Sequence, residues 1–144
     1  MKATKPVTRS ITEASGQQRL EAVAFLRAEG YKGDVQGLDR VFVAIDGARI
    51  IGAVRLAPEH GVTVLRGMRV SRPFQRQGVG RALLATLDSA LEDRPCYCIA
   101  YRWLRSFYGT IGFQEAEPAD VPAFLAERYS EYLADGSDVV LMRG

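Results

Sequence analysis

The sequence changes its hydrophobic period on either side of a short glycine-containing loop, and this change constrains the fold more than any other feature. Residues 62–70 have the apolar content of a strand. From Val79 to about Glu92, apolar side chains return every three or four positions, which is the period of a helix with one buried face. A strand, a loop and an amphipathic helix in this order predict a mixed α/β domain. The positions expected on the buried helix face are Val79, Leu83, Leu84, Leu87 and Leu91.

The other apolar segments extend this pattern along a chain of 144 residues, a length that fits one domain, residues 1–144. Turn signals at Asp46-Gly47 and at residues 58–61 divide three neighbouring strands into an antiparallel meander. We expect strands at residues 7–11, 41–45, 49–57, 62–70, 96–100, 113–116 and 137–142, and helices at residues 17–29, 79–92, 103–110 and within 118–133. Gly30 caps the first helix, whose apolar side is expected to comprise Leu20, Val23, Ala24 and Phe25.

Composition and cysteine usage argue against several classes of protein. Apolar residues make up 47% of the chain, and no apolar run approaches the roughly 20 residues of a membrane helix. No apolar segment follows the basic N-terminus, so we expect no secretory signal, no membrane association and a cytoplasmic location. Cys96 and Cys98 share one strand face and, even with the single His60, do not reach the four ligands of a structural zinc site. We therefore expect no metal, and we assign both cysteines to buried strand packing.

Positive charge is concentrated in one segment, although the net charge of the chain is only +2. Residues 60–87 contain no Asp or Glu, which favours the binding of an anion there. We do not expect nucleic acid, because the basic residues follow neither a helix face nor a nucleic-acid-binding motif. The basic side chains of this segment, apart from its terminal histidine, are Arg66, Arg69, Arg72, Arg76 and Arg81.

The loop at residues 75–80 has the parts of a phosphate cradle at a helix N-terminus. Gly78 and Gly80 remove side chains where the helix presents unpaired amides and the positive end of its dipole. The loop lacks the Lys-Ser or Lys-Thr pair of a Walker loop, and it also lacks the third glycine of the dinucleotide fingerprint. A Gly-x-Gly pair is also compatible with a plain turn before a helix, so the loop by itself predicts only an anion site.

Two motifs in order resemble those of the GNAT superfamily of N-acetyltransferases. Gln75-x-x-Gly78-x-Gly80, after Met68-Arg69-Val70, resembles motif A of that family, and Phe107-Tyr108-x-x-x-Gly112-Phe113 resembles motif B. The resemblance implies a mixed, mostly antiparallel sheet of six to seven strands flanked by helices and splayed in the middle. It also implies acetyl-CoA as co-substrate and an amine as acceptor. Homodimers are frequent in the family, so a homodimer is a candidate assembly by analogy alone.

The resemblance also assigns roles to residues around the loop. The backbone of Met68 and Val70 would contact pantetheine, with Arg69 turned to the opposite face of the strand. A bulge is expected at Gly67, and a backbone amide near Met68 or Arg69 would polarise the thioester oxygen in the slot between residues 62–70 and 96–100. The expected cofactor-binding residues are Met68, Arg69, Val70, Gln75, Arg76, Gln77, Gly78, Val79, Gly80 and Arg81.

Tyr108 is the expected catalytic residue, because the matching tyrosine of the family acts as general acid toward the sulfur of coenzyme A. The alternative interpretation is that Tyr108 only packs beside Phe107 and Phe113. No general base is assigned from the sequence. Glu59 and His60 lie on a turn at the far end of the strand from the phosphate loop, and we expect them to be exposed turn residues.

The sequence says little about the acceptor. We expect a small molecule or an amino acid, whose carboxylate would be bound by Arg66, Arg69 or Arg102. These arginines could instead serve the phosphates of coenzyme A or face solvent. A protein acetyltransferase acting on lysine or an N-terminus, and an acyl-CoA-binding module without turnover, are the alternatives. Lysine-rich peptides favour an acidic groove, and none is apparent near the loop.

Overall fold

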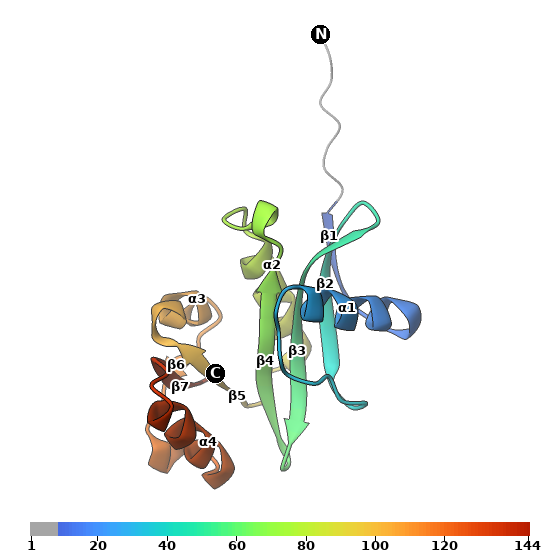
Figure 1. Cartoon of the computed structure of the whole chain (residues 1–144). Helices are drawn as coiled ribbons and strands as arrows, with labels where there is room; N and C mark the ends of the chain where they lie inside the picture. The colour runs from blue at the N-terminus through green and yellow to red at the C-terminus, as the bar shows by residue number, and fades with distance from the viewer. Residues whose placement is uncertain (1–8) are drawn as a thin grey trace.

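The computed structural model describes residues 9–144, which form one mixed sheet flanked by helices (Figure 1). The sheet has seven strands in the order β1-β2-β3-β4-β5-β7-β6 within the described range. This arrangement confirms the predicted fold class. The strands are β1 (Arg9–Glu13), β2 (Arg40–Asp46), β3 (Arg49–Glu59), β4 (Val62–Val70), β5 (Cys96–Tyr101), β6 (Gln114–Glu115) and β7 (Val139–Arg143). The helices are α1 (Gly16–Ala28), α2 (Val79–Leu91), α3 (Arg105–Gly109) and α4 (Ala123–Ala134), with short 3-10 turns η1 (Arg72–Phe74), η2 (Arg102–Leu104) and η3 (Pro118–Asp120).

The predicted elements are found in the predicted order, with shifts of a few residues at their ends. The first expected strand began at residue 7, which lies outside the described residues, and the observed strand continues to Glu13. The second turn of the meander is shorter than expected. β3 continues through Pro58 to Glu59, so that only His60 and Gly61 form the turn, both with positive φ. Two residues with positive φ match the twist of a tight hairpin.

Strands β4 and β5 run parallel and pair over a short length only. Their register contains Thr63 opposite Cys96 and Val64 opposite Tyr97, and no further pair. Beyond Val64 the two strands separate, which confirms the predicted splay. The remaining neighbouring strands of the sheet pair antiparallel.

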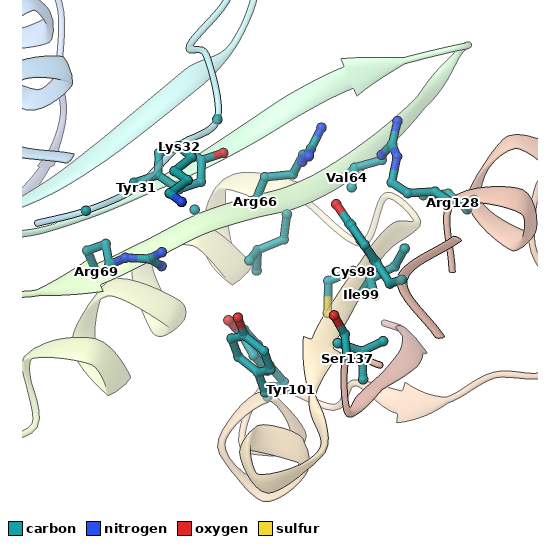
Figure 2. A pocket seen from close by; sticks show the side chains of 18 residues that line it. Tyr31, Lys32, Val64, Arg66, Arg69, Cys98, Ile99, Tyr101, Arg128 and Ser137 are labelled. Atoms are coloured by element: carbon teal, nitrogen blue, oxygen red, sulfur yellow. The ribbon is translucent and has the colours of Figure 1, made fainter. Parts of the chain in front are cut away.

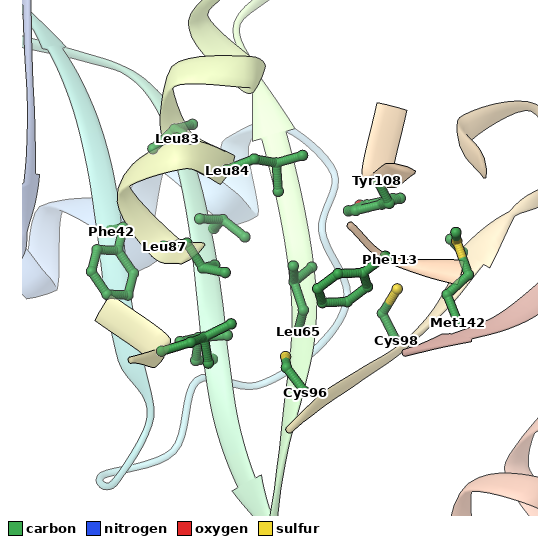
Figure 3. Packing of buried hydrophobic residues seen from close by; sticks show 14 of the residues in the cluster. Phe42, Leu65, Leu83, Leu84, Leu87, Cys96, Cys98, Tyr108, Phe113 and Met142 are labelled. Atoms are coloured by element: carbon green, nitrogen blue, oxygen red, sulfur yellow. The ribbon is translucent and has the colours of Figure 1, made fainter. Parts of the chain in front are cut away.

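Helix α2 supplies the core on one face of the sheet. All five positions predicted from its period are buried, and burying each leucine contributes about 1.5–3 kcal/mol. Figure 3 shows Leu65 between the leucines of α2 on one side and Phe113 and Cys98 on the other. On the face covered by α2, apolar side chains therefore bridge the two parts of the sheet and hold them together. The buried α2 residues are Val79, Leu83, Leu84, Leu87 and Leu91.

Helix α1 covers a different face, and its predicted buried side is wrong in part. Val41 and Val43 of β2 pack with α1, whereas the intervening Phe42 packs in the cluster that contains α2. The buried residues of α1 are Ala22 and Leu26, which lie four positions apart on the stripe that contacts β2 and β3. Val23 and Phe25 are partly buried at its margins. The remaining two predicted positions, Leu20 and Ala24, are exposed.

Candidate functional site

The loop between β4 and α2 is held in place by its own glutamine side chains. Gln75 donates through Nε2 to the carbonyl of Val70 at 3.0 Å, and Gln77 donates through Nε2 to the carbonyl of Pro73 at 3.0 Å. Gln77 also accepts a hydrogen bond from Arg9 at 2.6 Å. Gln75 therefore fixes the loop to the end of β4 and Gln77 fixes it to η1, and the expected contact of both with coenzyme A stays a prediction.

The end of this loop presents backbone amides at the start of α2. Gly78 is the N-cap residue and has a φ of 84°, and no side chain of the described chain caps the helix. Arg76 also adopts the left-handed region, with a φ of 63°. The first turn of α2 contains no acidic residue, and Arg76 and Arg81 are exposed beside it. Unpaired amides, the helix dipole and two guanidinium groups are together suited to an anion, and its binding here stays a prediction.

Glycine is required at positions 78 and 80 for two different physical reasons. A Cβ on Gly78 would meet nothing within 4 Å, so its requirement is the left-handed backbone alone. A Cβ on Gly80 would lie 3.1 Å from Cζ of Phe107 and 3.7 Å from a methyl carbon of Val70. Gly80 therefore allows the first turn of α2 to pack closely against α3 and β4, a role that the motif alone does not reveal.

Strand β4 contains a bulge at Gly67, as expected from the sequence. Ala53 pairs with Arg69 and Arg55 pairs with Arg66, so β4 has one more residue than β3 between these pairs. Gly67 lies in the bulge with a φ of 66°. A Cβ there would lie 2.6 Å from Cζ of Tyr31, so the ring of Tyr31 occupies the space that a larger residue would need.

After the bulge, side chains of β4 alternate between the core and a cavity. Met68 and Val70 pack against the cluster that contains α2, and Arg69 lines the cavity on the other side. The predicted division of these three side chains between two faces is thus observed. The backbone contacts of Met68 and Val70 with pantetheine stay a prediction.

The cavity has a volume of about 570 Å³, within the usual range for small-molecule sites, and lies where β4 and β5 separate (Figure 2). Its walls come from the loop after α1, from β4, β5, α3 and α4, and from residues at the start of β7. Six segments that are far apart in the sequence therefore meet at the splay. The loop at residues 75–81 does not line this cavity, so the loop and the cavity are two separate features, with β4 between them.

Tyr108 packs among aromatic side chains and also lines the cavity, and its expected catalytic role stays a prediction. Its ring packs edge-on against Phe107 at 5.2 Å between centroids and lies 6.4 Å from Phe113. The same side chain lines the cavity although the residue is only 6% exposed. Burial raises the pKa of Tyr108, with a smaller contribution from Cys98, while the charge of Arg69 opposes the shift. Tyr108 therefore remains a neutral phenol, able to donate a hydrogen bond, well above neutral pH.

Both cysteines are buried and free, as predicted. Burial raises the pKa of Cys96 to about 12 and also raises that of Cys98, which lines the cavity. Because the thiolate is the reactive form, neither thiol has the properties of an activated nucleophile.

The charged residues of the cavity differ in part from the expected ones. Arg66 and Arg69 line it, but Arg102 does not: its side chain is exposed and pairs with Asp138 at 2.9 Å. Arg102 follows the last residue of β5, beyond the splay, and its expected role as a carboxylate clamp is not supported. Lys32 and Arg128 line the cavity and were not predicted. They lie on a loop and on α4, and no local sequence pattern indicates that these segments face β4.

Glu59 is not the exposed turn residue that we expected. Its side chain is 17% exposed and accepts hydrogen bonds from Arg128 at 2.7 Å and from Arg66 at 3.4 Å. The reason is that α4 packs over the turn between β3 and β4, where the rings of His60 and Phe124 lie 4.4 Å apart. His60 itself is exposed, as predicted.

A buried ion pair supports the loop after α1. Arg55 contacts Asp39 at 2.5 Å, with both side chains almost fully buried, and donates to the hydroxyl of Tyr31 at 2.9 Å. Arg55 also donates to the carbonyl of Asp34 at 2.6 Å. The guanidinium groups of Arg55 and Arg69 lie 5.5 Å and 5.4 Å from the ring centroid of Tyr31. This network fixes Tyr31 over the bulge and thereby shapes one wall of the cavity.

Comparisons with known proteins agree with this geometry. A family model described as an acetyltransferase (GNAT) domain matches residues 37–115, more than half of the chain. No curated protein sequence matches the chain. Within the part of the chain that the structure describes, residues 9–144, no helix is both long and apolar enough to cross a membrane.

Several solved structures share the fold at low sequence identity. An acyl-CoA N-acyltransferase from Pseudomonas aeruginosa aligns with a TM-score of 0.67 and 23% identity, over 96% of this chain and 99% of that one. The ribosomal-protein-S18-alanine N-acetyltransferase from Escherichia coli aligns with a TM-score of 0.68 and 20% identity, over 94% and 92%. N-acetylglutamate synthase from Neisseria gonorrhoeae, complexed with coenzyme A and N-acetyl-glutamate, aligns with a TM-score of 0.68 and 17% identity. This last alignment covers 96% of this chain and 35% of the synthase.

Proposed function

The chain belongs to the GNAT acetyltransferase family, and from that premise we propose that it moves the acetyl group of acetyl-CoA to a primary amine. Both substrates would be bound at once, and the amine would attack the thioester directly. The observation that carries the proposal is the cavity at the splay of β4 and β5, which Tyr108 and the bulged part of β4 both line. The acceptor would be a small molecule or an amino acid, because the cavity is of small-molecule size.

The donor would bind along β4 with its pyrophosphate at the loop. The amides of Gln77 to Arg81 and the exposed guanidinium groups of Arg76 and Arg81 suit a pyrophosphate, which is a dianion with many acceptor oxygens. Val70 lies against Gly80, so a pantetheine arm bound to the backbone of Met68 and Val70 would run from the loop toward the bulge. This path leads the thioester to the cavity.

The thioester oxygen would accept a hydrogen bond from the backbone of β4 near Met68 or Arg69. The loss of pairing with β5 beyond Val64 leaves this part of β4 without a strand neighbour, among the described residues, on the side of the splay. A fixed donor at a developing oxyanion typically contributes about 3 kcal/mol.

Tyr108 would donate to the departing sulfur. At reference values a phenol near pKa 10 is a weaker acid than a thiol near 8.5, so full proton transfer to the thiolate is unfavourable by about 2 kcal/mol. Burial raises the pKa of Tyr108, but the same surroundings raise that of Cys98, so a thiolate leaving there also becomes more basic. A hydrogen bond that strengthens as charge builds on sulfur is therefore the proposed contribution of Tyr108.

Direct attack is favoured over an acetyl-enzyme because Cys98, which lines the cavity, is a protonated thiol. Initial rates measured while both substrates are varied distinguish the two routes. Intersecting lines in the double-reciprocal plot are expected for a ternary complex, and parallel lines would contradict direct attack. Cys98→Ala is expected to retain turnover, whereas an acetyl-enzyme on this sulfur would abolish it.

The activity itself is tested by release of coenzyme A with free amino acids, polyamines and lysine peptides as acceptors. Acetylation of at least one amine above the rate of acetyl-CoA hydrolysis supports the proposal. Calorimetry with coenzyme A accompanies the assay. If coenzyme A binds and no amine is acetylated, the chain is a binding module and the proposed activity is wrong.

A further inference from the structure

The cavity at the splay is unusual for a site that receives an amine, because its charged lining is entirely cationic among the described residues. Lys32 comes from the loop after α1, Arg66 and Arg69 from β4, and Arg128 from α4. No Asp or Glu of residues 9–144 lines it. Figure 2 shows Lys32, Arg66 and Arg128 along one side of the cavity and Cys98, Ile99 and Ser137 along the other. A free amine is itself protonated at neutral pH, so these side chains repel an acceptor whose only charge is its amine.

One pair of these cations is held in position by a carboxylate behind them. Glu59 accepts from Arg128 at 2.7 Å and from Arg66 at 3.4 Å, so that it joins β3, β4 and α4. Each guanidinium carries five N–H donors and uses only one of them on Glu59. The remaining donors are available to a ligand, and one carboxylate does not neutralise two guanidinium groups.

The other two cations make no ion pair with any residue in the described range 9–144. Lys32 is exposed, and its flexible stem allows the ammonium to follow a ligand. Arg69 stacks on Tyr31 and donates through Nη1 to the carbonyl of Met68 at 2.9 Å, which fixes its direction beside the bulge. The cavity therefore keeps a net positive charge after the ion pairs with Glu59 are counted.

We propose that the acceptor is a small amine that also carries an anionic group, a carboxylate or a phosphonate, which Lys32, Arg66 and Arg128 bind. The inference rests on the proposed acetyltransferase activity and names the substrate class of the same site. Charge-assisted hydrogen bonds to guanidinium groups are strong enough to select the anion, and the amine is then directed to the side of Tyr108. Polyamines and lysine-rich peptides are poor acceptors in this scheme.

Matched amines test the proposal: amines with an acidic group are compared with amines that lack it, and two further pairs vary the kind of anion or the side-chain charge. L-lysine is compared with cadaverine, L-phenylalanine with phenethylamine, and β-alanine with ethylamine and with 2-aminoethylphosphonate; L-glutamate and L-glutamine differ only in side-chain charge. The expected result is a kcat/KM at least tenfold higher for the member that carries the acidic group, with glutamate better than glutamine. Comparison of β-alanine with 2-aminoethylphosphonate shows whether the site prefers a carboxylate or a phosphonate.

Two outcomes separate this inference from the proposed activity. If amines without an acidic group are acetylated as well as their anionic partners, the inference is overturned and the acetyltransferase activity stands. If coenzyme A binds and no amine of the panel is acetylated, both fall.

Variants of the cationic residues give a second test on the preferred anionic acceptor. Lys32→Gln and Arg128→Gln are each expected to raise the KM for the acceptor about tenfold, with little change in kcat and in the KM for acetyl-CoA. Lys32 is exposed, so its variant folds even if loss of Arg128 destabilises α4. Arg27→Gln, on the exposed side of α1 and outside the cavity, is the matched control. An unchanged acceptor KM in Lys32→Gln and in a folded Arg128→Gln would remove these side chains from anion binding.

Discussion

The phosphate loop and the cavity bind their ligands, in our proposal, by two different kinds of chemistry. The loop uses backbone amides of consecutive residues, 77–81, together with exposed arginines. The cavity uses side chains from six segments that extend from Gly30 to Val139. Recognition by a continuous backbone leaves a motif in the sequence, because glycines are required at fixed spacing. Recognition by side chains brought together from distant segments leaves no such motif.

The two regions also differ in how their shape is maintained. Local hydrogen bonds hold the phosphate loop: the side chains of Gln75 and Gln77 donate to carbonyls four or five residues earlier in the chain. Long-range contacts hold the cavity: Arg55 with Asp39 fixes the wall that contains Tyr31, and Glu59 fixes Arg66 and Arg128. We therefore expect that substitutions far along the sequence from the ligand contacts weaken binding of the acceptor in the cavity more than binding of coenzyme A at the loop.

The largest expected effect is that of Asp39→Ala, which leaves Arg55 buried without its carboxylate. Breaking a buried ion pair from one side lowers the free energy of unfolding by about 3–5 kcal/mol. Urea denaturation measures this change. Because the loop after α1 loses its anchor, the KM for the acceptor should rise, while calorimetry should find the affinity for coenzyme A nearly unchanged.

The exposed pair of Glu13 and Arg40 provides the control, since its side chains are 42% and 38% exposed. Glu13→Gln is expected to lower stability by less than about 1 kcal/mol and to leave both substrates unaffected. An equal loss of donor and acceptor affinity in Asp39→Ala would show that the two regions are not maintained separately.

Tyr108→Phe should have the second largest effect and should act on the chemical step alone. Loss of the donor to the leaving sulfur is expected to lower kcat about 100-fold, with coenzyme A affinity and acceptor KM retained. The ring packing against Phe107 and Phe113 is preserved in phenylalanine, so stability should change little. Unchanged turnover would restrict Tyr108 to the packing role.

The pH profile adds a check with a defined sign. Because burial raises the pKa of Tyr108, the hydroxyl stays protonated as pH passes the ordinary phenol value of about 10. The wild-type rate should therefore show no decline near pH 10 that Tyr108→Phe lacks. Such a decline would mean that the phenol ionises at its ordinary pKa.

Sequence patterns predicted what depends on local chain geometry. The five buried positions of α2 follow from one helical period, and the bulge at Gly67 follows from a resemblance that includes local backbone shape. The buried side of α1 was wrong in part because the helix has several apolar residues, and only its contact with β2 and β3 selects Ala22 and Leu26.

The residues around the cavity could not be predicted in the same way, because their positions depend on contacts between distant segments that no local sequence pattern encodes. Glu59 is two positions from a turn glycine, which in the sequence indicates exposure. In the structure α4, more than sixty residues away in the chain, packs over it and contributes Arg128 as its partner. Arg102 was a candidate for binding a carboxylate because of its guanidinium group, but it follows the end of β5, and there its side chain pairs with Asp138. Lys32 and Arg128 carried no signal at all, because a loop lysine and a helical arginine are ordinarily solvated.

Arg81→Glu tests the phosphate loop, the region proposed to bind coenzyme A. The change places a carboxylate in the first turn of α2, beside the proposed pyrophosphate, and should weaken coenzyme A about tenfold or more. The residue is exposed, so the fold should be retained. Pantetheine, which lacks the pyrophosphate, serves as control ligand: its affinity should be the same for both proteins. A parallel loss of pantetheine binding would contradict the placement of phosphates at the loop.

The smallest expected effect concerns Glu59, which positions two guanidinium groups without itself lining the cavity. Burial alone would raise its pKa, but the hydrogen bond and charge of Arg128, with those of Arg66, more than offset this and hold the pKa below its usual value. The carboxylate therefore contributes stability that is present above the unfolded pKa, near 4.5, and is lost as pH falls through the lower folded value. Glu59→Gln removes this contribution. The stability difference from wild type should be largest near neutral pH and shrink below about pH 4.

The same variant should raise the acceptor KM about two- to fivefold, because Arg66 and Arg128 remain but lose their fixed direction. Glu59→Asp, which keeps the charge and shortens the side chain, should recover part of this loss, and the KM for acetyl-CoA should not change in either variant. A stability difference that is independent of pH, or an acceptor KM equal to that of wild type, would show that the carboxylate only fills space under α4. The comparison would then be between a loop held by hydrogen bonds and a cavity held by packing, with Arg66 and Arg128 positioned by β4 and α4 and not by Glu59.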